Sequence, residues 1–203
     1  MRIFTLLVSL MVGARIFLKK QSPSPITPIE RFTRWFIEPV EVLSRYVPGG
    51  GGAFVAMSVG FFLCERYFRS TTGVGDDTSA AASRTFKDAA ADHFGVNRDF
   101  FSAFWTIYRH GMQHQGSPKN DTVANIPYKW RIDAGYPDVP SRWDHLGHVY
   151  ICINPWGFAK KVFDLFLNDQ PRIAEVGTHQ LGVVQPALPP AAPVLVKTGD
   201  PYP

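Results

Sequence analysis

The sequence predicts an all-α fold: a bundle of four to five helices, with an irregular insert before the last helix that has room for one short β-hairpin. Three observations indicate it: helix-capping residues precede apolar segments, apolar residues recur in these segments at helical spacing, and glycine or proline separates them. The 203 residues, 45% apolar, suffice for one compact domain. We divide the chain into an N-terminal apolar and basic segment with a linker (1–26), the bundle (27–170, insert 117–153) and a proline-rich tail (171–203).

The first two helices are marked by their ends. Residues 27–30 (TPIE) form a capping box with proline at the first helical position, so a helix begins there. Its apolar stripe consists of Ile29, Phe32, Phe36, Val40 and Leu43. Pro48 and the glycines at 49–52 end it. Residues 53–69 are then apolar on nearly all sides until Glu65, which is typical of a central helix surrounded by others.

Three more helices follow from the same signals. Phe86, Ala90 and Phe94 lie on one face of a third helix, which Gly95 ends. Asn97 caps a fourth helix that runs to Gly116, and Asn154 with Pro155 begins a fifth over residues 156–167. Between them, residues 117–153 are punctuated by prolines, and we interpret them as the irregular insert.

The charge of the chain is unevenly distributed. The formal net charge is +4, but residues 1–20 hold four basic side chains and no acidic one, so the remainder balances at zero. Contact with nucleic acid must therefore come from a local patch rather than from the overall charge. The two cysteines, Cys64 and Cys152, exclude a disulfide scaffold and are interpreted as buried thiols.

The N-terminal segment contains an apolar run over residues 3–14. It is shorter than the roughly 20 residues that span a bilayer, so we expect no stable membrane span. The run fits a signal peptide, an amphipathic surface segment, or the consequence of a misassigned start. We expect a cytoplasmic protein, or a secreted or periplasmic one if residues 1–14 are a signal peptide.

One constellation, residues 108–116 (YRHGMQHQG), carries more polarity than a buried helix needs. His110 and His114 are spaced i, i+4 and so lie on one helix face, as metal ligands often do. However, Gly111 stands where a zinc protease has its glutamate, and only His145 and His148 remain as candidate third ligands. We keep a histidine-coordinated metal hydrolase as a remote alternative and expect no cofactor.

The same constellation has an arginine followed, after four residues, by a histidine: Arg109 and His114. This spacing resembles the signature of the HEPN superfamily of small helical-bundle proteins, in which a polar residue often follows the arginine, as His110 does here. The order of residues 65–67 (ERY) and 108–111 (YRHG) is also similar to that of small uncharacterised bacterial proteins of this kind, over about residues 25–170.

This resemblance implies metal-independent RNA cleavage, in which the 2′-hydroxyl attacks the adjacent phosphate. His114 would act as general acid or base, and Arg109 would hold the phosphate. Glu65 would orient Arg109 or a histidine. The second proton-transfer group would come from a homodimer with a shared site or from His110 of the same chain. The resemblance places such an activity in a bacterial toxin, defence or stress role.

The alternative is a noncatalytic module that binds RNA or another protein, in which Glu65, Arg66 and Arg109 form ion pairs at the rim of the bundle. In either case, the candidate RNA-binding residues are Lys119, Arg98, Lys129 and Arg131. The tryptophans and tyrosines in and near the insert either stack on unpaired bases or pack in the core or a lid: Trp130, Trp143, Trp156, Tyr128 and Tyr136.

Overall fold

A computed structural model describes residues 26–48 and 50–176, so the expected N-terminal segment at 1–25 and the tail from 177 lie outside the described residues. The helical elements are α2 (Pro28–Phe32), η1 (Thr33–Ile37), α3 (Glu38–Tyr46), α4 (Gly50–Thr71), α5 (Ala80–Phe94), α6 (Arg98–Phe104), η2 (Trp105–His110), α7 (Gly111–Gln115), α8 (Pro155–Asn168) and α9 (Gln170–Glu175). The strands are β1 (Asp121–Val123), β2 (Ile126–Ile132), β3 (Ser141–His145) and β4 (His148–Ile153).

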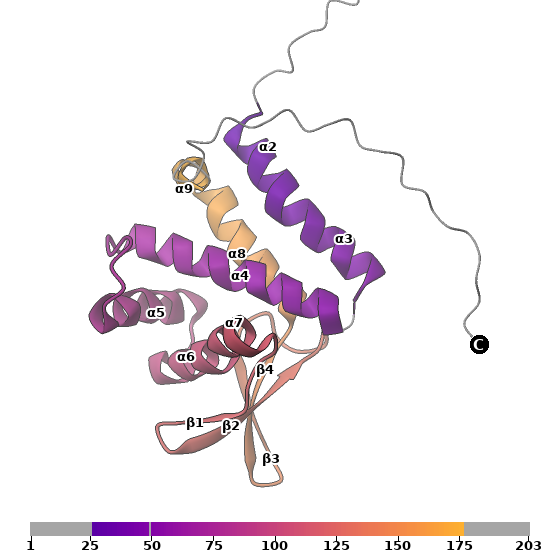
Figure 1. The fold of residues 1–203 in the computed structure, drawn as a ribbon, viewed down its shortest axis with the longest axis vertical. Helices are drawn as coiled ribbons and strands as arrows, with labels where there is room; N and C mark the ends of the chain where they lie inside the picture. Colours follow the sequence, from indigo (N-terminus) through magenta and orange to yellow (C-terminus); the bar gives the residue numbers. More distant parts are fainter. Residues whose placement is uncertain (1–25, 49, 177–203) are drawn as a thin grey trace, which may run out of the picture.

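The fold is α/β, and the all-α prediction is wrong. The segment expected to be an irregular insert forms a four-stranded mixed sheet of order β1-β2-β4-β3. The outer pairs are antiparallel, and the central strands β2 and β4 run parallel, with Trp130 opposite Ile151. The sheet lies at one end of the molecule, beneath α6 and α7 (Figure 1).

Two hairpins build this sheet where the sequence suggested room for one. Ala124 and Asn125 join β1 to β2 with φ of 49° and 63°, and Leu146 and Gly147 join β3 to β4 with φ of 48° and 75°. Two-residue turns with positive φ at both positions match the right-handed twist of the strands they connect. The parallel pairing of β2 with β4 then joins the two hairpins.

Several of the helix ends predicted from the sequence are confirmed, but α4 begins at Gly50, so the glycines at 50–52 that were expected to separate two helices form its first turn. The capping box of Thr27 and Glu30 is present, and the side chain of Asn97 accepts a hydrogen bond from the Phe100 backbone N–H. Gly95 and Gly116, with φ of 66° and 72°, end α5 and α7 in the left-handed conformation that favours glycine. Beyond α8, the folded part continues through α9, of which all residues but Gln170 fall within the segment assigned to the tail.

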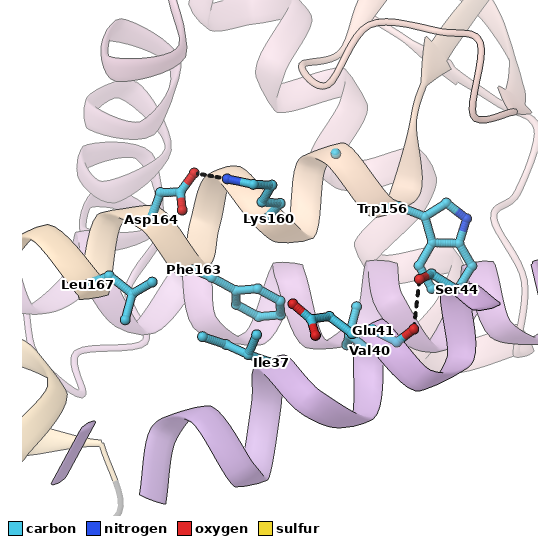
Figure 2. A pocket seen from close by; sticks show the side chains of 10 residues that line it. Ile37, Val40, Glu41, Ser44, Trp156, Lys160, Phe163, Asp164 and Leu167 are labelled. Carbon is cyan, nitrogen blue, oxygen red and sulfur yellow. Dashed lines mark hydrogen bonds and ion pairs between the residues drawn. The ribbon is translucent and has the colours of Figure 1, made fainter. Parts of the chain in front are cut away.

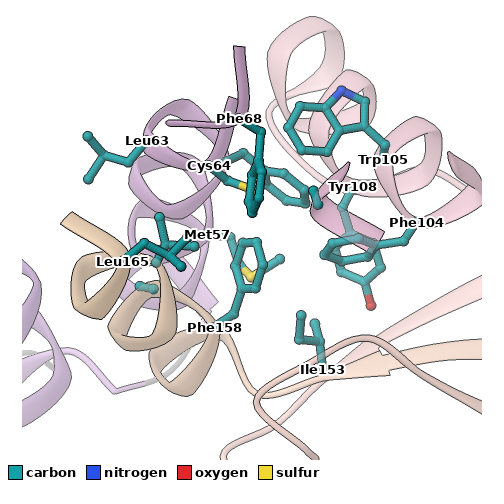
Figure 3. Packing of buried hydrophobic residues seen from close by; sticks show 14 of the residues in the cluster. Met57, Leu63, Cys64, Phe68, Phe104, Trp105, Tyr108, Ile153, Phe158 and Leu165 are labelled. Carbon is teal, nitrogen blue, oxygen red and sulfur yellow. The ribbon is translucent and has the colours of Figure 1, made fainter. Parts of the chain in front are cut away.

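The core is centred on α4, which packs most extensively against α8 (Figure 3). The Phe61 ring lies 4.9 Å from that of Phe104 and 5.3 Å from that of Phe158, and all three side chains are buried. Cys64 and Cys152 are free buried thiols, as expected, and burial raises the pKa of both. Within the described residues, no helix has both the length and the apolar character needed to cross a membrane.

Tyr108 joins the helices to the sheet. Its side chain is fully buried, and its hydroxyl oxygen lies 2.7 Å from the Ile151 carbonyl oxygen and 2.9 Å from that of Arg131 (Figure 3). The same oxygen accepts a hydrogen bond of 3.2 Å from the Arg131 N–H. Burial raises the pKa of Tyr108 well above its ordinary value, so the phenol stays protonated. It therefore fixes η2 against β2 and β4.

Candidate functional site

The polar constellation lies at the end of the continuous helix formed by α6, η2 and α7, where the chain turns back toward β1. Gly111 makes this return possible, because a Cβ there would lie 2.6 Å from the backbone nitrogen of Lys119 and 2.8 Å from the carbonyl oxygen of Ser117. The Lys119 N–H donates to the carbonyl of Ile107 at 3.0 Å, which holds the loop on the helix. Gly111 is thus needed for close backbone contact.

Two histidines face each other at this helix end. The ring centroids of His110 and His114 are 6.5 Å apart, and both side chains are exposed. Partial burial of the ring lowers the pKa of His110, and the positive charges of Arg109, Lys87, His114 and Lys119 lower it further. His110 is therefore neutral at pH 7 and can accept a proton.

Lys87 is a member of this group that the sequence analysis missed. It projects from α5, 23 positions before His110, and no spacing rule connects the two residues. Burial lowers the pKa of Lys87, while Asp88 raises it, Arg84 lowers it and Glu65 raises it. Its electrostatic effect on His110 arises from the tertiary fold, because the two residues belong to different helices.

Arg109 points to a different partner, Glu65 of α4. One guanidinium nitrogen of Arg109 lies 2.9 Å from Glu65 Oε2, and Arg69 Nε lies 2.8 Å from Oε1. These side chains are only about a fifth exposed. Arg69 is further held by the Asp77 carbonyl at 2.6 Å and lies over the Phe86 ring. Glu65 thus binds both arginines at once.

Arg109 also lines a hollow of about 420 Å³ beside this ion pair, together with Phe62, Glu65, Arg66, Arg69, Gly75, Asp76 and Thr78. Side chains five positions apart on a helix point roughly 140° apart, at about 100° per residue. Accordingly, Arg109 faces α4 whereas His114 contacts His110. The structure brings together His110 with His114 and Arg109 with Glu65, and Arg109 still acts on His110 through its charge.

The candidate RNA-binding residues fall in three places. Arg98 forms hydrogen bonds of 2.9 and 2.6 Å with Asp92, so its charge is matched at the junction of α5 and α6. Lys119 pairs with Asp121, and its charge also acts on His110. Lys129 and Arg131 lie on β2, where their side chains contact aromatic rings.

The metal interpretation required a third ligand for His110 and His114. Within residues 26–48 and 50–176, no three histidine, cysteine, aspartate or glutamate side chains gather where they could hold a metal ion. The two candidates from the sequence, His145 and His148, pair with each other across the β3–β4 hairpin.

A further hollow, of about 440 Å³, lies between α3 and α8 (Figure 2). Its walls include the apolar side chains of Val40 and Phe163, and Trp156 stands at one end. Lys160 and Asp164 form an ion pair of 2.8 Å on its α8 side. It contains none of the site residues predicted from the sequence.

Side-chain geometry therefore points to the histidine pair and its cations as the candidate site. No family model, no curated protein and no solved structure matches this chain.

Proposed function

We propose that this protein is a metal-independent endoribonuclease in which His110 and His114 transfer protons to and from RNA. The observation that carries the proposal is the pair itself: two exposed histidines of one chain, with ring centroids 6.5 Å apart, among positive charges. At this separation both imidazoles can reach the same phosphodiester group.

Neutral His110 takes the proton from a ribose 2′-hydroxyl, and the 2′-oxygen attacks the adjacent phosphorus. The bond between phosphorus and the 5′-oxygen breaks, and the leaving oxygen takes a proton from His114. The products are a 2′,3′-cyclic phosphate and a 5′-hydroxyl. Each histidine ends in the protonation state in which the other began.

Negative charge grows on the phosphate oxygens during this attack, and cations that are already in place stabilise it. Lys87, Arg109 and Lys119 act on His110 through their charges. Arg109 and Lys119 are each paired with a carboxylate as well. Because His110 and His114 belong to one chain, proton transfer does not require a second copy. The homodimer that the HEPN resemblance implies stays a prediction.

The α/β fold departs from the helical bundle of that resemblance, so the side chains carry this proposal rather than the fold. The bacterial toxin, defence or stress role and the cytoplasmic location also stay predictions.

The test is cleavage of a labelled RNA by pure protein in the presence of a chelator. His110→Ala and His114→Ala should each lower the rate about 10²- to 10⁴-fold, the range for loss of a general acid or base. His93→Ala removes an exposed histidine at the far end of α5 and should cleave at the wild-type rate. Equal cleavage by all four proteins would contradict the proposal and identify a contaminating nuclease.

The second candidate function is a noncatalytic RNA-binding module. The contact between Glu65 and Arg109 favours it, because this carboxylate occupies the arginine that would otherwise hold the phosphate. RNA that is bound but never cut, with unchanged affinity for the His110→Ala and His114→Ala variants, would select this alternative.

A further inference from the structure

The sheet has one face against the helices, and the opposite face is exposed to solvent except at the buried Cys152. Tyr128, Ile151 and Ile153 are buried on the helix side. Since side chains alternate along a strand, their neighbours project to the other side. We call this side the open face and define it by Lys129, Arg131, Trp143, His145, His148 and Tyr150.

Aromatic rings on the open face form an ordered stack. The rings of Trp143 and His145 are stacked, 4.6 Å apart with 16° between their planes, and Trp143 lies 5.4 Å from Tyr150. The guanidinium carbon of Arg131 lies 4.9 Å from the ring centroid of Trp143 and the same distance from that of Tyr150. Trp143 is 37% exposed, and His145 is exposed at the outer side of the stack. A flat aromatic group can therefore extend the stack from solvent.

Charge on the open face has one sign. Lys129 and Arg131 supply two cations, and the Lys129 Nζ lies 5.9 Å from the centroid of the Tyr150 ring. The two carboxylates of the strands, Asp121 and Asp144, project from the opposite side by the same alternation. A ligand with flat rings and negative charge complements this face, and unpaired nucleotides have both properties. A duplex hides the faces of its bases in the helical stack and offers only phosphates and groove edges.

We propose that the open face binds single-stranded RNA, with unpaired bases extending the stack of Trp143, His145 and Tyr150 and with phosphates held by Lys129 and Arg131. This inference rests on the proposed function, because it names the form of RNA that the histidine pair would receive. The hydroxyl of Tyr108 bonds the backbone of Arg131 and so fixes the open face relative to the helix that carries His110.

Binding can be measured apart from cleavage with a short 2′-O-methyl RNA, which lacks the attacking hydroxyl. In fluorescence anisotropy, Trp143→Ala should weaken binding of the single strand roughly tenfold or more, as expected for loss of a stacking ring, and Trp143→Phe should restore most of it. The matched control is Trp35→Ala, which removes an exposed tryptophan from η1 and should leave the Kd unchanged. Lys129→Gln should also reduce the dependence of binding on salt.

Wild-type affinity for the Trp143→Ala variant, or equal affinity of the wild type for single strand and duplex, would overturn the inference. The inference would also be overturned if the wild type did not bind the oligonucleotide and light scattering showed self-association through this face. The open face would then be a protein contact surface. The nuclease proposal and the open-face proposal can be refuted independently of each other. Binding without cleavage of ordinary RNA refutes only the nuclease, and cleavage with wild-type affinity in Trp143→Ala refutes only the open face.

Discussion

Substitution of Tyr108 by phenylalanine tests how the sheet is held against the helices. The change removes only the hydroxyl, whose single hydrogen can reach the carbonyl oxygen of Ile151 at 2.7 Å or that of Arg131 at 2.9 Å. The hydroxyl oxygen also accepts the Arg131 N–H at 3.2 Å. One donated and one accepted bond are lost: the bond to Ile151 is buried, and the bond from the Arg131 N–H is partly buried.

A buried hydrogen bond contributes about 1 kcal/mol net, and an unsatisfied partner adds to the loss, so Tyr108→Phe should lower the free energy of unfolding by at least about 2 kcal/mol. For a domain of this size, that corresponds to a fall in Tm of roughly 4–8 °C. Thermal unfolding followed by circular dichroism measures it. Tyr46→Phe is the control, since Tyr46 is 79% exposed. An unchanged Tm for Tyr108→Phe would refute the view that this hydroxyl joins η2 to the sheet.

Four further predictions concern the candidate site. Gly111→Ala forces a Cβ against the backbone at Lys119, so it should destabilise the protein by about 1–3 kcal/mol in a thermal melt and slow RNA cleavage. In wild type, the acid limb of the kcat/KM profile should have its midpoint below pH 6.5, because cleavage needs neutral His110 and its pKa is lowered. Lys87→Met should move that midpoint toward higher pH, because one of the positive charges that lower the His110 pKa is removed. An unchanged midpoint would show that Lys87 does not influence the titration of His110. Glu65→Gln leaves two partly buried arginines without their carboxylate and should cost about 1–3 kcal/mol in denaturant unfolding, whereas unaltered stability would show that the ion pairs contribute nothing.

The helices were predictable because their signals are local. Asn97, for example, supplies the side-chain acceptor at the start of α6. Gly95 adopts the positive φ at the end of α5. Such signals depend on a few neighbouring residues and survive any tertiary arrangement.

The sheet was not predictable to the same extent. The strands have three to seven residues, and the turns use Ala124 and Leu146 at positive φ, which non-glycine residues seldom adopt. The pairing of β2 with β4 joins the two hairpins into one sheet. These strands are separated in the sequence by β3 and a loop, so no local pattern specifies their pairing. A buried tyrosine in a helix gives no sign that its hydroxyl binds strand backbone.

The candidate site was found in part. Helical spacing placed His110 beside His114, and Glu65 pairs with Arg109, one of the partners that the sequence suggested for it. Lys87 was missed because it belongs to another helix. The open face was missed as a unit because Arg131 and Trp143 meet only when β2, β4 and β3 are assembled.

The chemistry of the cut RNA ends tests the nuclease most directly. Wild-type protein, incubated with RNA in a chelator, should leave 2′,3′-cyclic phosphate and 5′-hydroxyl ends, which mass spectrometry distinguishes from other termini. His114→Ala should yield neither end above the background of a mock purification. Products with 3′-hydroxyl ends, or cyclic phosphate formed equally by wild type and His114→Ala, would contradict the assignment of proton transfer to His110 and His114.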